Sequence, residues 1–347
     1  MTNLEKAVYN TDMSNRLRNT GRITMDDIAS KLGLSKTTVS RAISGKGRIC
    51  QDTRDRILAC IRENGYQPNQ MARALAASRT YNIAIVIPDE KSGGEAQFFS
   101  DCLVGITKAA VSHDYDTVLV VVPDDDMSGL ERLVRNSKAD GVVVTRMNEQ
   151  DRIIPFLKSR KLPFVLIGTN TNGDILQIDS NQQEGCRELT KHMLDAGCRR
   201  IALLAGNRGH IVDMMRYEGY KAAFEESGLH PDEHLVFWNA QQNCAAAVNA
   251  ALEAHADCIV CMDDMICIGA VDYLTVVPVR IPDELQVVSF YDSAALSSGK
   301  IPVTALHVDS LNLCMRAGNL LIDEIEGRTP PRRNVAEYSI IYRNSSR

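Results

Sequence analysis

The chain has 347 residues, of which 44% are hydrophobic and 24% are charged, a composition typical of a globular protein with two or three domains. Its first 22 residues are polar and lack the apolar core of a signal peptide. The longest apolar strings, such as VLVVV at 118–122, are far shorter than the roughly 20 residues of a membrane-spanning helix. These features argue against a membrane protein and predict a cytoplasmic location.

Charge is divided unevenly along the chain. Residues 1–80 contain 14 Lys and Arg against 7 Asp and Glu, a net charge of +7, whereas the remainder contains 25 against 37, a net charge of −12. Because attraction to nucleic-acid phosphates is local, a basic head on an acidic body indicates that only the head meets a polyanion. A solvated basic surface is the alternative that charge alone leaves open.

The ten cysteines and seven histidines carry no metal-binding pattern. Cys258 and Cys261 match CxxC, but they lie in an apolar run predicted as a strand, where an odd offset puts the two side chains on opposite faces. There is no HExxH sequence and no paired cysteine and histidine spacing. We therefore expect buried, reduced thiols, no metal site and no cofactor.

The polar N-terminus is followed by a short region that predicts an all-α domain of three helices over residues 23–67. Gly33 permits a left-handed turn between the first two helices, which gives a helix-turn-helix arrangement. Its predicted core consists of Ile28, Leu32, Leu34, Val39 and Ala42, with Ala29 small enough for a close helix crossing.

The second of these helices carries a polar, cationic face. Ser35 is placed to cap its N-terminus, and at 100° per residue one face holds Lys36, Thr37, Ser40 and Arg41. Small hydroxyls allow close approach to a duplex and bind phosphates, and arginine can bind a guanine edge through two hydrogen bonds. The pattern predicts a recognition helix for the major groove, although exposed helices of this composition are also common.

Residues 68–80 predict a hinge helix and linker, since the segment opens at Pro68 and Asn69 and is too short and too poor in apolar residues to fold alone. Residues 1–22 are expected to be a flexible polar arm, in which Arg16, Arg18 and Arg22 can touch phosphates. A misassigned start codon is the alternative explanation of this arm.

From Asn82 onward, short β-branched runs alternate with helical stretches, as in NIAIVIP (82–88), DGVVVT (140–145) and RIALLAG (200–206). Apolar strands separated by amphipathic segments predict doubly wound parallel sheets with helices on both faces. Such sheets bind ligands in a crevice at the carboxyl ends of their strands.

Several spaced motifs together resemble the LacI/GalR family of transcriptional regulators. The segments are TMDDIASKLGLSKTTVSRAISG (24–45), TRDRILACIRENGYQPNQMARALA (53–76), RYEGYKAAF (216–224), CMDDMICIGA (261–270) and IPDELQVVSFYD (281–292). They occur in the order usual for the family, and the resemblance covers nearly everything after residue 22.

For the head, the resemblance implies binding to a near-palindromic double-stranded operator as a homodimer. Lys36, Thr37 and Arg41 match the main base-reading positions, and Leu75 matches a leucine that inserts into the minor groove. The remaining DNA-binding positions are expected at Thr24, Ser35, Thr38, Ser40, Ser44 and Asn69.

For residues 81–347, the resemblance implies an effector-binding and dimerisation domain similar to type I periplasmic binding proteins. One subdomain is expected at about 81–178 and 309–328, and the other at about 179–308 and 329–347, with three crossings near residues 179, 308 and 330. An effector in the cleft between them changes their angle and thereby the state of the hinge.

The effector site implied by the resemblance departs from the family pattern. Its expected residues are Phe98, Phe99, Arg146, His210, Arg216, Asp263 and Tyr291. Tyr291 stands where sugar-binding members carry an aspartate, and Gly168 stands where an aspartate is frequent. A glycoside, a phosphorylated sugar or a nucleobase therefore stays open as effector, and an ordinary monosaccharide is not expected.

The function indicated is a sequence-specific regulator, a repressor of a carbohydrate-related operon whose operator affinity depends on a small molecule. A regulator gated by a partner phosphocarrier protein is the main alternative. An α/β enzyme is not expected, because no GxGxxG, GxSxG or P-loop sequence and no acid-base constellation is found. A free solute-binding protein would lack the helical head.

Overall fold

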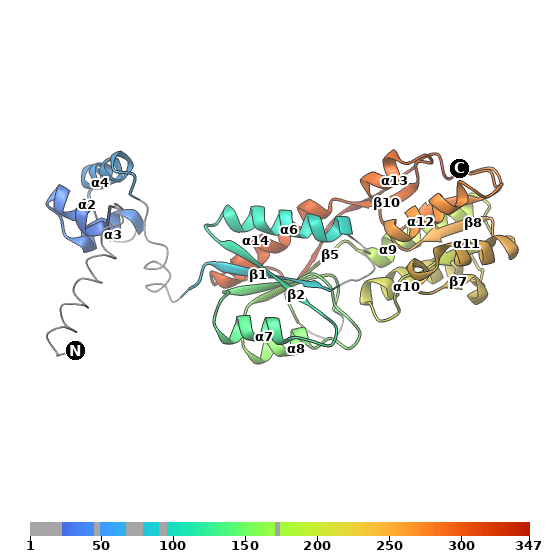
Figure 1. Ribbon diagram of the computed structural model, residues 1–347, viewed down its shortest axis with the longest axis horizontal. Helices are drawn as coiled ribbons and strands as arrows, with labels where there is room; N and C mark the ends of the chain where they lie inside the picture. The colour runs from blue at the N-terminus through green and yellow to red at the C-terminus, as the bar shows by residue number, and fades with distance from the viewer. Residues whose placement is uncertain (1–22, 45–48, 67–78, 90–95, 171–173) are drawn as a thin grey trace, which may run out of the picture. The chain divides into compact units, whose positions relative to one another are not determined.

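The computed structural model describes residues 23–44, 49–66, 79–89, 96–170 and 174–347, which belong to two compact units divided between Ser78 and Arg79 (Figure 1). The polar arm predicted at residues 1–22 and the hinge helix predicted from residue 68 lie outside the described residues. The predicted fold class is confirmed: an all-α head precedes a body with two sheets and helices between the strands.

The head contains three short helices, α2 (Met25–Leu32), α3 (Lys36–Ser44) and α4 (Gln51–Glu63). Gly33 has φ 66° and ends α2 in the left-handed conformation, as predicted for the turn. The predicted core is confirmed, because Ile28, Val39 and Ala42 are buried and pack with Ile57 of α4. A small core of this kind fixes the angle at which α3 is presented.

The first sheet of the body has the strand order β11-β5-β4-β3-β1-β2, and all of its strands are parallel. Its strands are β1 (Asn82–Pro88), β2 (Asp116–Val122), β3 (Gly141–Val144), β4 (Phe164–Ile167), β5 (Gln177–Asp179) and β11 (Arg333–Val335). Helices α6 (Ala96–Val111) and α14 (Ser310–Ile325) cover one face, and α7 (Ser128–Arg135) and α8 (Ile153–Ser159) cover the other (Figure 1). Successive residues of β1 alternate between these two cores, since Ile83 and Ile85 belong to the first and Ala84 and Val86 to the second.

The second sheet has the order β12-β10-β9-β8-β6-β7. Its strands are β6 (Ile201–Leu204), β7 (Val236–Phe237), β8 (Cys258–Cys261), β9 (Gln286–Ser289), β10 (Thr304–Val308) and β12 (Tyr338–Ile341). Its helices are α9 (Gln182–Asp195), α10 (Ile211–Glu226), α11 (Cys244–Glu253), α12 (Asp264–Leu274) and α13 (Ala294–Ser298), with 3-10 turns η1 (Glu233–Leu235) and η2 (Ala240–Gln242). Strand β12 is antiparallel to β10, so this sheet is parallel except at one edge.

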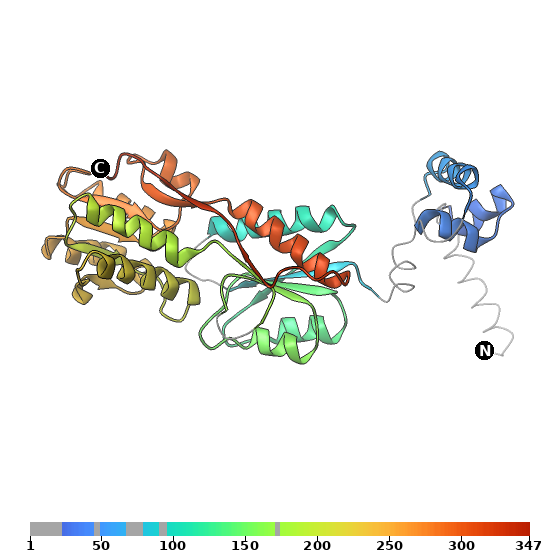
Figure 2. The ribbon, with the colours of Figure 1, turned by 180° about the vertical axis from the view of Figure 1, so that it is seen from behind.

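The chain passes between the two sheets three times, at residues 180–181 after β5, at Asp309 after β10, and at residues 336–337 after β11 (Figure 2). The first two crossings lie where the sequence predicted them. The expectation that residues from about 329 belong to the second subdomain is wrong for β11, which pairs with β5 in the first sheet. The third crossing therefore falls about six residues after the predicted position, because a three-residue strand at a sheet edge gives no periodic signal.

The body begins at a fixed anchor. The Asp140 carboxylate accepts hydrogen bonds from the backbone N–H of Thr80 at 2.7 Å, from the Thr80 hydroxyl at 2.9 Å and from the backbone N–H of Tyr81 at 2.8 Å. The Arg79 guanidinium donates to the carbonyl oxygen of Ile325 at the end of α14. The first three residues of the body are thus tied to both β3 and α14.

The CxxC cysteines are core residues, as expected. Cys258 and Cys261 are fully buried, and burial raises the pKa of both thiols well above the usual value, which keeps them protonated and unreactive. Among the residues that the structure describes, no group of three or more His, Cys, Asp or Glu side chains is arranged to hold a metal ion. Within the same ranges, no helix combines the length and the apolar character that a membrane crossing requires.

Helices α9 and α10 pack closely because Gly219 has no side chain. A Cβ at this position would lie 2.2 Å from the carbonyl oxygen of Gln183 and 3.1 Å from the backbone nitrogen of Arg187. We expect Gly219→Ala to destabilise the body by about 2 kcal/mol or more, since backbone atoms of α9 must move. Chemical unfolding followed by circular dichroism measures the midpoint.

Gly129→Ala in α7 is the matched control, because the nearest atom to its added Cβ is 4.0 Å away. It should leave the midpoint unchanged or raise it, since alanine favours the helix by about 1 kcal/mol. Equal effects of the two substitutions would contradict the packing argument.

Candidate functional site

The polar face of α3 is solvent-exposed, whereas its opposite side is packed. Lys36, Thr37, Ser40 and Arg41 are exposed on the surface of the head, and Val39 and Ala42 behind them are 0% and 1% exposed. Thr38 is half-buried, and its backbone N–H donates to the Ser35 hydroxyl at 3.2 Å, so Ser35 caps α3 as predicted. The head therefore presents a rigid helix whose outward side chains are hydroxyls and cations.

Several of the expected DNA-contacting groups, among them Lys36 and Thr24, already have partners within the head. The Lys36 ammonium lies 2.8 Å from the Asp26 carboxylate in an exposed ion pair. The Thr24 hydroxyl donates to Asp27 at 2.7 Å and accepts from the Asp27 backbone N–H, which caps α2. An exposed ion pair is worth at most about 1 kcal/mol, so Lys36 can exchange Asp26 for a phosphate at little cost.

The remaining expected DNA-binding positions are only partly described. Ser44 is the last residue of α3, but its side chain lies outside what the structure describes, and so do Asn69 and Leu75 entirely. They stay predictions.

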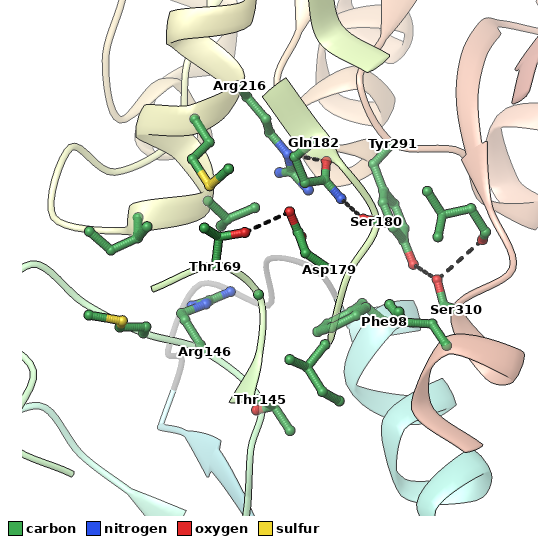
Figure 3. Close-up of a pocket in the computed structure, with 18 residues that line it drawn as sticks. Phe98, Thr145, Arg146, Thr169, Asp179, Ser180, Gln182, Arg216, Tyr291 and Ser310 are labelled. Carbon is green, nitrogen blue, oxygen red and sulfur yellow. Dashed lines mark hydrogen bonds between the residues drawn. The ribbon is translucent and has the colours of Figure 1, made fainter. Parts of the chain in front are cut away.

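A cleft opens in the body between its two sheets, with an empty volume of about 660 Å³. Residues that line it follow β3, β4 and β5 in the first sheet and β9 and β10 in the second, and others lie on α6, α9, α10 and α14 (Figure 3). The cleft is thus at the carboxyl ends of the strands, where the fold class predicts it.

Arg216 of α10 is the most buried charged group at the cleft, with 2% of its surface exposed. Its Nε donates to Oε1 of Gln182 at 3.1 Å, and Nε2 of Gln182 donates to the Ser180 hydroxyl (Figure 3). Asp213 lies 3.6 Å from its Nη1. Burial would raise the pKa of Asp213, but the hydrogen bond with His210 and the charge of Arg216 outweigh burial and hold that pKa below its usual value. The guanidinium therefore stays charged in the cleft wall.

Asp179, at the end of β5, is a carboxylate in the cleft that sequence reasoning missed. Its Oδ2 accepts from the Thr169 hydroxyl at 2.9 Å, and burial raises its pKa (Figure 3). Ser180, Gln182 and Ser310 also line the cleft and were not predicted. Their positions beside the strand ends and crossings were the signal available, but it does not single out individual residues.

Four of the seven expected effector residues line the cleft: Phe98, Arg146, Arg216 and Tyr291. The Tyr291 hydroxyl is 2.7 Å from the Ser310 hydroxyl, so tyrosine gives this wall an aromatic face and a hydrogen bond in place of a carboxylate. Burial lowers the pKa of Arg146 to about 10. Its guanidinium stacks over the Phe99 ring at 5.0 Å, which places Phe99 behind Arg146 rather than in the lining.

The other expected effector residues have structural contacts. Asp263 caps α12, because its Oδ1 accepts from the backbone N–H of Ile266 at 2.8 Å. The imidazole of His210 lies 3.4 Å from Oδ2 of Asp213 and 3.4 Å from Nδ2 of Asn207. Neither is among the residues that line the cleft.

Main-chain hydrogen bonds close one side of the cleft. The backbone N–H of Glu149, after β3, donates to the carbonyl oxygen of Gly209 at 2.9 Å, and that of Ile211 donates to the carbonyl oxygen of Met147 at 3.3 Å. Asn148 and His210 face each other between these bonds as an antiparallel bridge. We call residues 147–149 with 209–211 the mouth bridge. It joins the two subdomains without passing through any of the three crossings.

Comparison with known proteins gives consistent matches over both units. Residues 80–325 match the family model of periplasmic binding proteins and the sugar-binding domain of the LacI family, and residues 24–69 match that of bacterial regulatory proteins of the lacI family. The chain is 29% identical over 277 residues to the HTH-type transcriptional regulator AglR of Rhizobium meliloti (strain 1021), which covers 78% of each chain.

Solved structures of similar proteins also match both units of the chain. A complex of the transcriptional regulator CelR with cellobiose matches with a TM-score of 0.70 and 26% identity, over 93% of this chain and 100% of the other. The lac repressor dimer bound to operator and the anti-inducer ONPF matches in fold with a TM-score of 0.76 and 20% identity, over 93% and 99% of the two chains.

The mouth bridge yields a prediction that needs no ligand. Ile211 is the first residue of α10 after its N-cap, a position where proline is tolerated. Ile211→Pro removes the N–H that bonds Met147 and should open the bridge, whereas Ile211→Ala keeps that N–H. Hydrogen exchange at the Glu149 amide should become at least about tenfold faster in the proline variant only, for a loss near 1.4 kcal/mol. Equal protection in both variants would show that these bonds do not hold the mouth closed.

Proposed function

The chain belongs to the LacI family of bacterial regulatory proteins, and from this membership we propose how it acts as a DNA-binding transcriptional regulator. A homodimer binds a near-palindromic operator through two heads, and a carbohydrate-derived effector in the cleft sets operator affinity. The protein represses a carbohydrate-related operon in the cytoplasm. The observation that carries the DNA half is the exposed polar and cationic face of α3 on a packed core.

The chemistry of α3 favours base reading over general adhesion to DNA. Arg41 is exposed one turn after Thr37, and an arginine at such a position can form two hydrogen bonds with a guanine edge in the major groove. Lys36 and Thr37 lie at the N-terminus of the helix, which enters the groove deepest in helix-turn-helix proteins. The hydroxyls of Ser35, Thr38 and Ser40 line the same end and suit phosphate contacts.

The effector half rests on the composition of the cleft. Asp179 supplies a carboxylate although Tyr291 and Gly168 do not, and Gln182 and Arg216 supply an amide and a guanidinium beside it. Carboxylate, amide and guanidinium groups together accept and donate hydrogen bonds to vicinal hydroxyls. The CelR structure, whose title names cellobiose, supports a carbohydrate. A cleft between the two subdomains that is lined by both apolar and charged side chains favours a small molecule over the phosphocarrier alternative.

An exposed apolar surface supports the homodimer. Val104 and Val111 of α6 are 45% and 65% exposed, and Leu119 and Val121 of the neighbouring edge strand β2 are 49% and 47% exposed. Such side chains on one helix and an unpaired edge mark an interface, and a two-fold dimer would pair this surface with itself.

The DNA assignment is tested with Arg41→Ala. If Arg41 reads a guanine, its loss should relax the preference at one operator position by about 1–3 kcal/mol. Binding to fragments from the region upstream of its own gene, compared with random duplexes at fixed salt, measures this by fluorescence anisotropy. Arg62→Ala on α4 removes the same charge from another exposed position and serves as control. Equal losses on specific and random DNA for Arg41→Ala would remove the base-reading role.

The effector assignment is tested with Asp179→Asn. Burial raises the pKa of Asp179, so its charged form costs the folded protein free energy that grows as the pH rises through that pKa. Asparagine should therefore leave the melting temperature at pH 7 unchanged or higher. Binding of the carbohydrate that changes operator affinity should weaken about 10–100-fold, because a hydrogen bond to a charged acceptor is worth about 1.5–3 kcal/mol.

Titration calorimetry on the full chain measures this affinity. Thr169→Val, which removes only the hydroxyl that donates to Asp179, is the milder control and should weaken binding less. Unchanged affinity in Asp179→Asn would place the effector elsewhere.

A further inference from the structure

A second pocket, which we call the switch-point pocket, lies in the first subdomain at the carboxyl ends of β1, β2 and β3, with an empty volume of about 500 Å³. Strand β1 lies between β2 and β3, so the chain leaves β1 toward one side and later returns on its other side. Parallel sheets bind ligands at such a point, because the connecting loops diverge there and leave a crevice. The effector cleft instead follows the ends of β3, β4 and β5, and it shares Arg146 with this pocket.

Apolar side chains form one wall of the switch-point pocket. Val86 of β1 and Val122 of β2 are buried, and Met127 and Ile153 pack on the same core. Alkyl and thioether groups gain from contact with other apolar groups and offer little to a hydroxyl. This wall therefore suits an alkyl chain better than a polyhydroxyl ring.

Opposite charges lie side by side at the rim of the pocket without pairing. The Arg152 Nη2 donates to the main-chain carbonyl oxygen of Asp124 at 2.8 Å, and the Asp124 Oδ1 accepts from Nδ2 of Asn148 at 3.0 Å. Arg152 and Asp124 are both exposed, and within the described ranges each has only neutral hydrogen-bond partners. A molecule that carries both a cation and an anion can supply the missing counter-charge to each of them.

Asn148 provides a buried acceptor between these charges and the interior. Because its Nδ2 is bonded to Asp124, its Oδ1 faces another way, and this oxygen is buried without a hydrogen-bond partner in the part of the chain that the structure describes. A buried acceptor that lacks a donor is unfavourable. A ligand that donates an N–H to Oδ1 thus gains more there than at the exposed rim.

The other polar groups of the pocket leave it without net charge. The Asp151 carboxylate accepts from the backbone N–H groups of Ile153 and Ile154, and Arg146 stacks on Phe99. Gln150 is exposed. With Asp124 and Asp151 against Arg146 and Arg152, the described lining holds two carboxylates and two guanidinium groups. This balance favours a zwitterion over a simple anion or cation.

We propose that the switch-point pocket binds a free aliphatic amino acid as a second regulatory ligand. Its ammonium donates to Oδ1 of Asn148 beside the Asp124 carboxylate, and its carboxylate accepts from Arg152. Its side chain packs on Val122, Met127 and Ile153. The proposal goes beyond the carbohydrate effector of the cleft and does not depend on it.

The test uses matched probes in titration calorimetry on the full chain. L-Valine, L-leucine, L-isoleucine and L-methionine are titrated first. The tightest binder is then compared with its carboxamide, its 2-hydroxy analogue and the analogue that has hydrogen in place of the amino group. The last analogue should bind at least about tenfold more weakly, because Asn148 Oδ1 then stays buried without a donor. The carboxamide and the 2-hydroxy analogue each lose one charge at the exposed rim and should bind up to about fivefold more weakly. Binding by none of the four amino acids, or equal affinity across the series, would overturn the proposal.

Variants at the rim locate the site. Arg152→Gln should abolish the difference between the amino acid and its carboxamide. Asp124→Asn should abolish the difference between the amino acid and its 2-hydroxy analogue, while asparagine still offers an oxygen to Asn148. The controls Arg135→Gln and Asp125→Asn remove the same charges from exposed positions that do not line the pocket, and both differences should persist in them. Persistence of both differences in the two rim variants would place the amino acid elsewhere and overturn the site.

The pocket is also connected to the mouth bridge. Asn148 faces His210 in that bridge, and the backbone N–H of the next residue, Glu149, donates to the carbonyl oxygen of Gly209. A ligand held by Asn148 fixes this strand, so a saturating amino acid should slow hydrogen exchange at the Glu149 amide. Unchanged exchange at saturation would overturn the connection to the bridge.

Discussion

A buried guanidinium organises the body. Arg216 is 2% exposed, and an arginine cannot shed its charge, so the fold must supply partners for it. Gln182 ties it to the first crossing, and Asp213 ties it to the loop that carries the mouth bridge, because Asp213 also accepts from the backbone N–H of Asn207 and contacts His210. The Arg216 guanidinium therefore links the first crossing to the mouth bridge. Gly219 lets α9 and α10 pack closely, which brings Gln182 of α9 within hydrogen-bond distance of Arg216.

The helical head and the two sheets were predictable because their signals are local. Gly33 and the apolar spacing around Ile28 and Val39 define the helix-turn-helix, and continuous apolar runs define the strands. The site was predictable only in part. Asp179 lines the cleft because β5 ends there, and Asp263 and His210 were matched to family positions but are held by a helix cap and by Asp213. Those positions depend on how the strands and helices pack in three dimensions, which spacing along the sequence does not reveal.

Arginine–aromatic stacks occur beside both strands of the mouth bridge. Arg146 lies over Phe99 in the first subdomain, and Arg208 lies 4.7 Å over the ring of Trp238 in the second. Each arginine directly precedes one strand of the bridge, so each stack fixes a bridge strand to its own subdomain. The two subdomains contribute to this arrangement in the same way.

The hydrogen bonds at residues 79–81 determine how motion of the first subdomain reaches the start of the body. Three hydrogen bonds from Thr80 and Tyr81 converge on Asp140, and Arg79 is held by the end of α14, which itself follows the second crossing. Residues 79–81, where the chain enters the first subdomain, are consequently fixed to it. When the first subdomain rotates, residue 79 therefore moves with it as part of the same rigid body. The Asp140 carboxylate is the group that makes this connection rigid, because it holds Thr80 and Tyr81 in place.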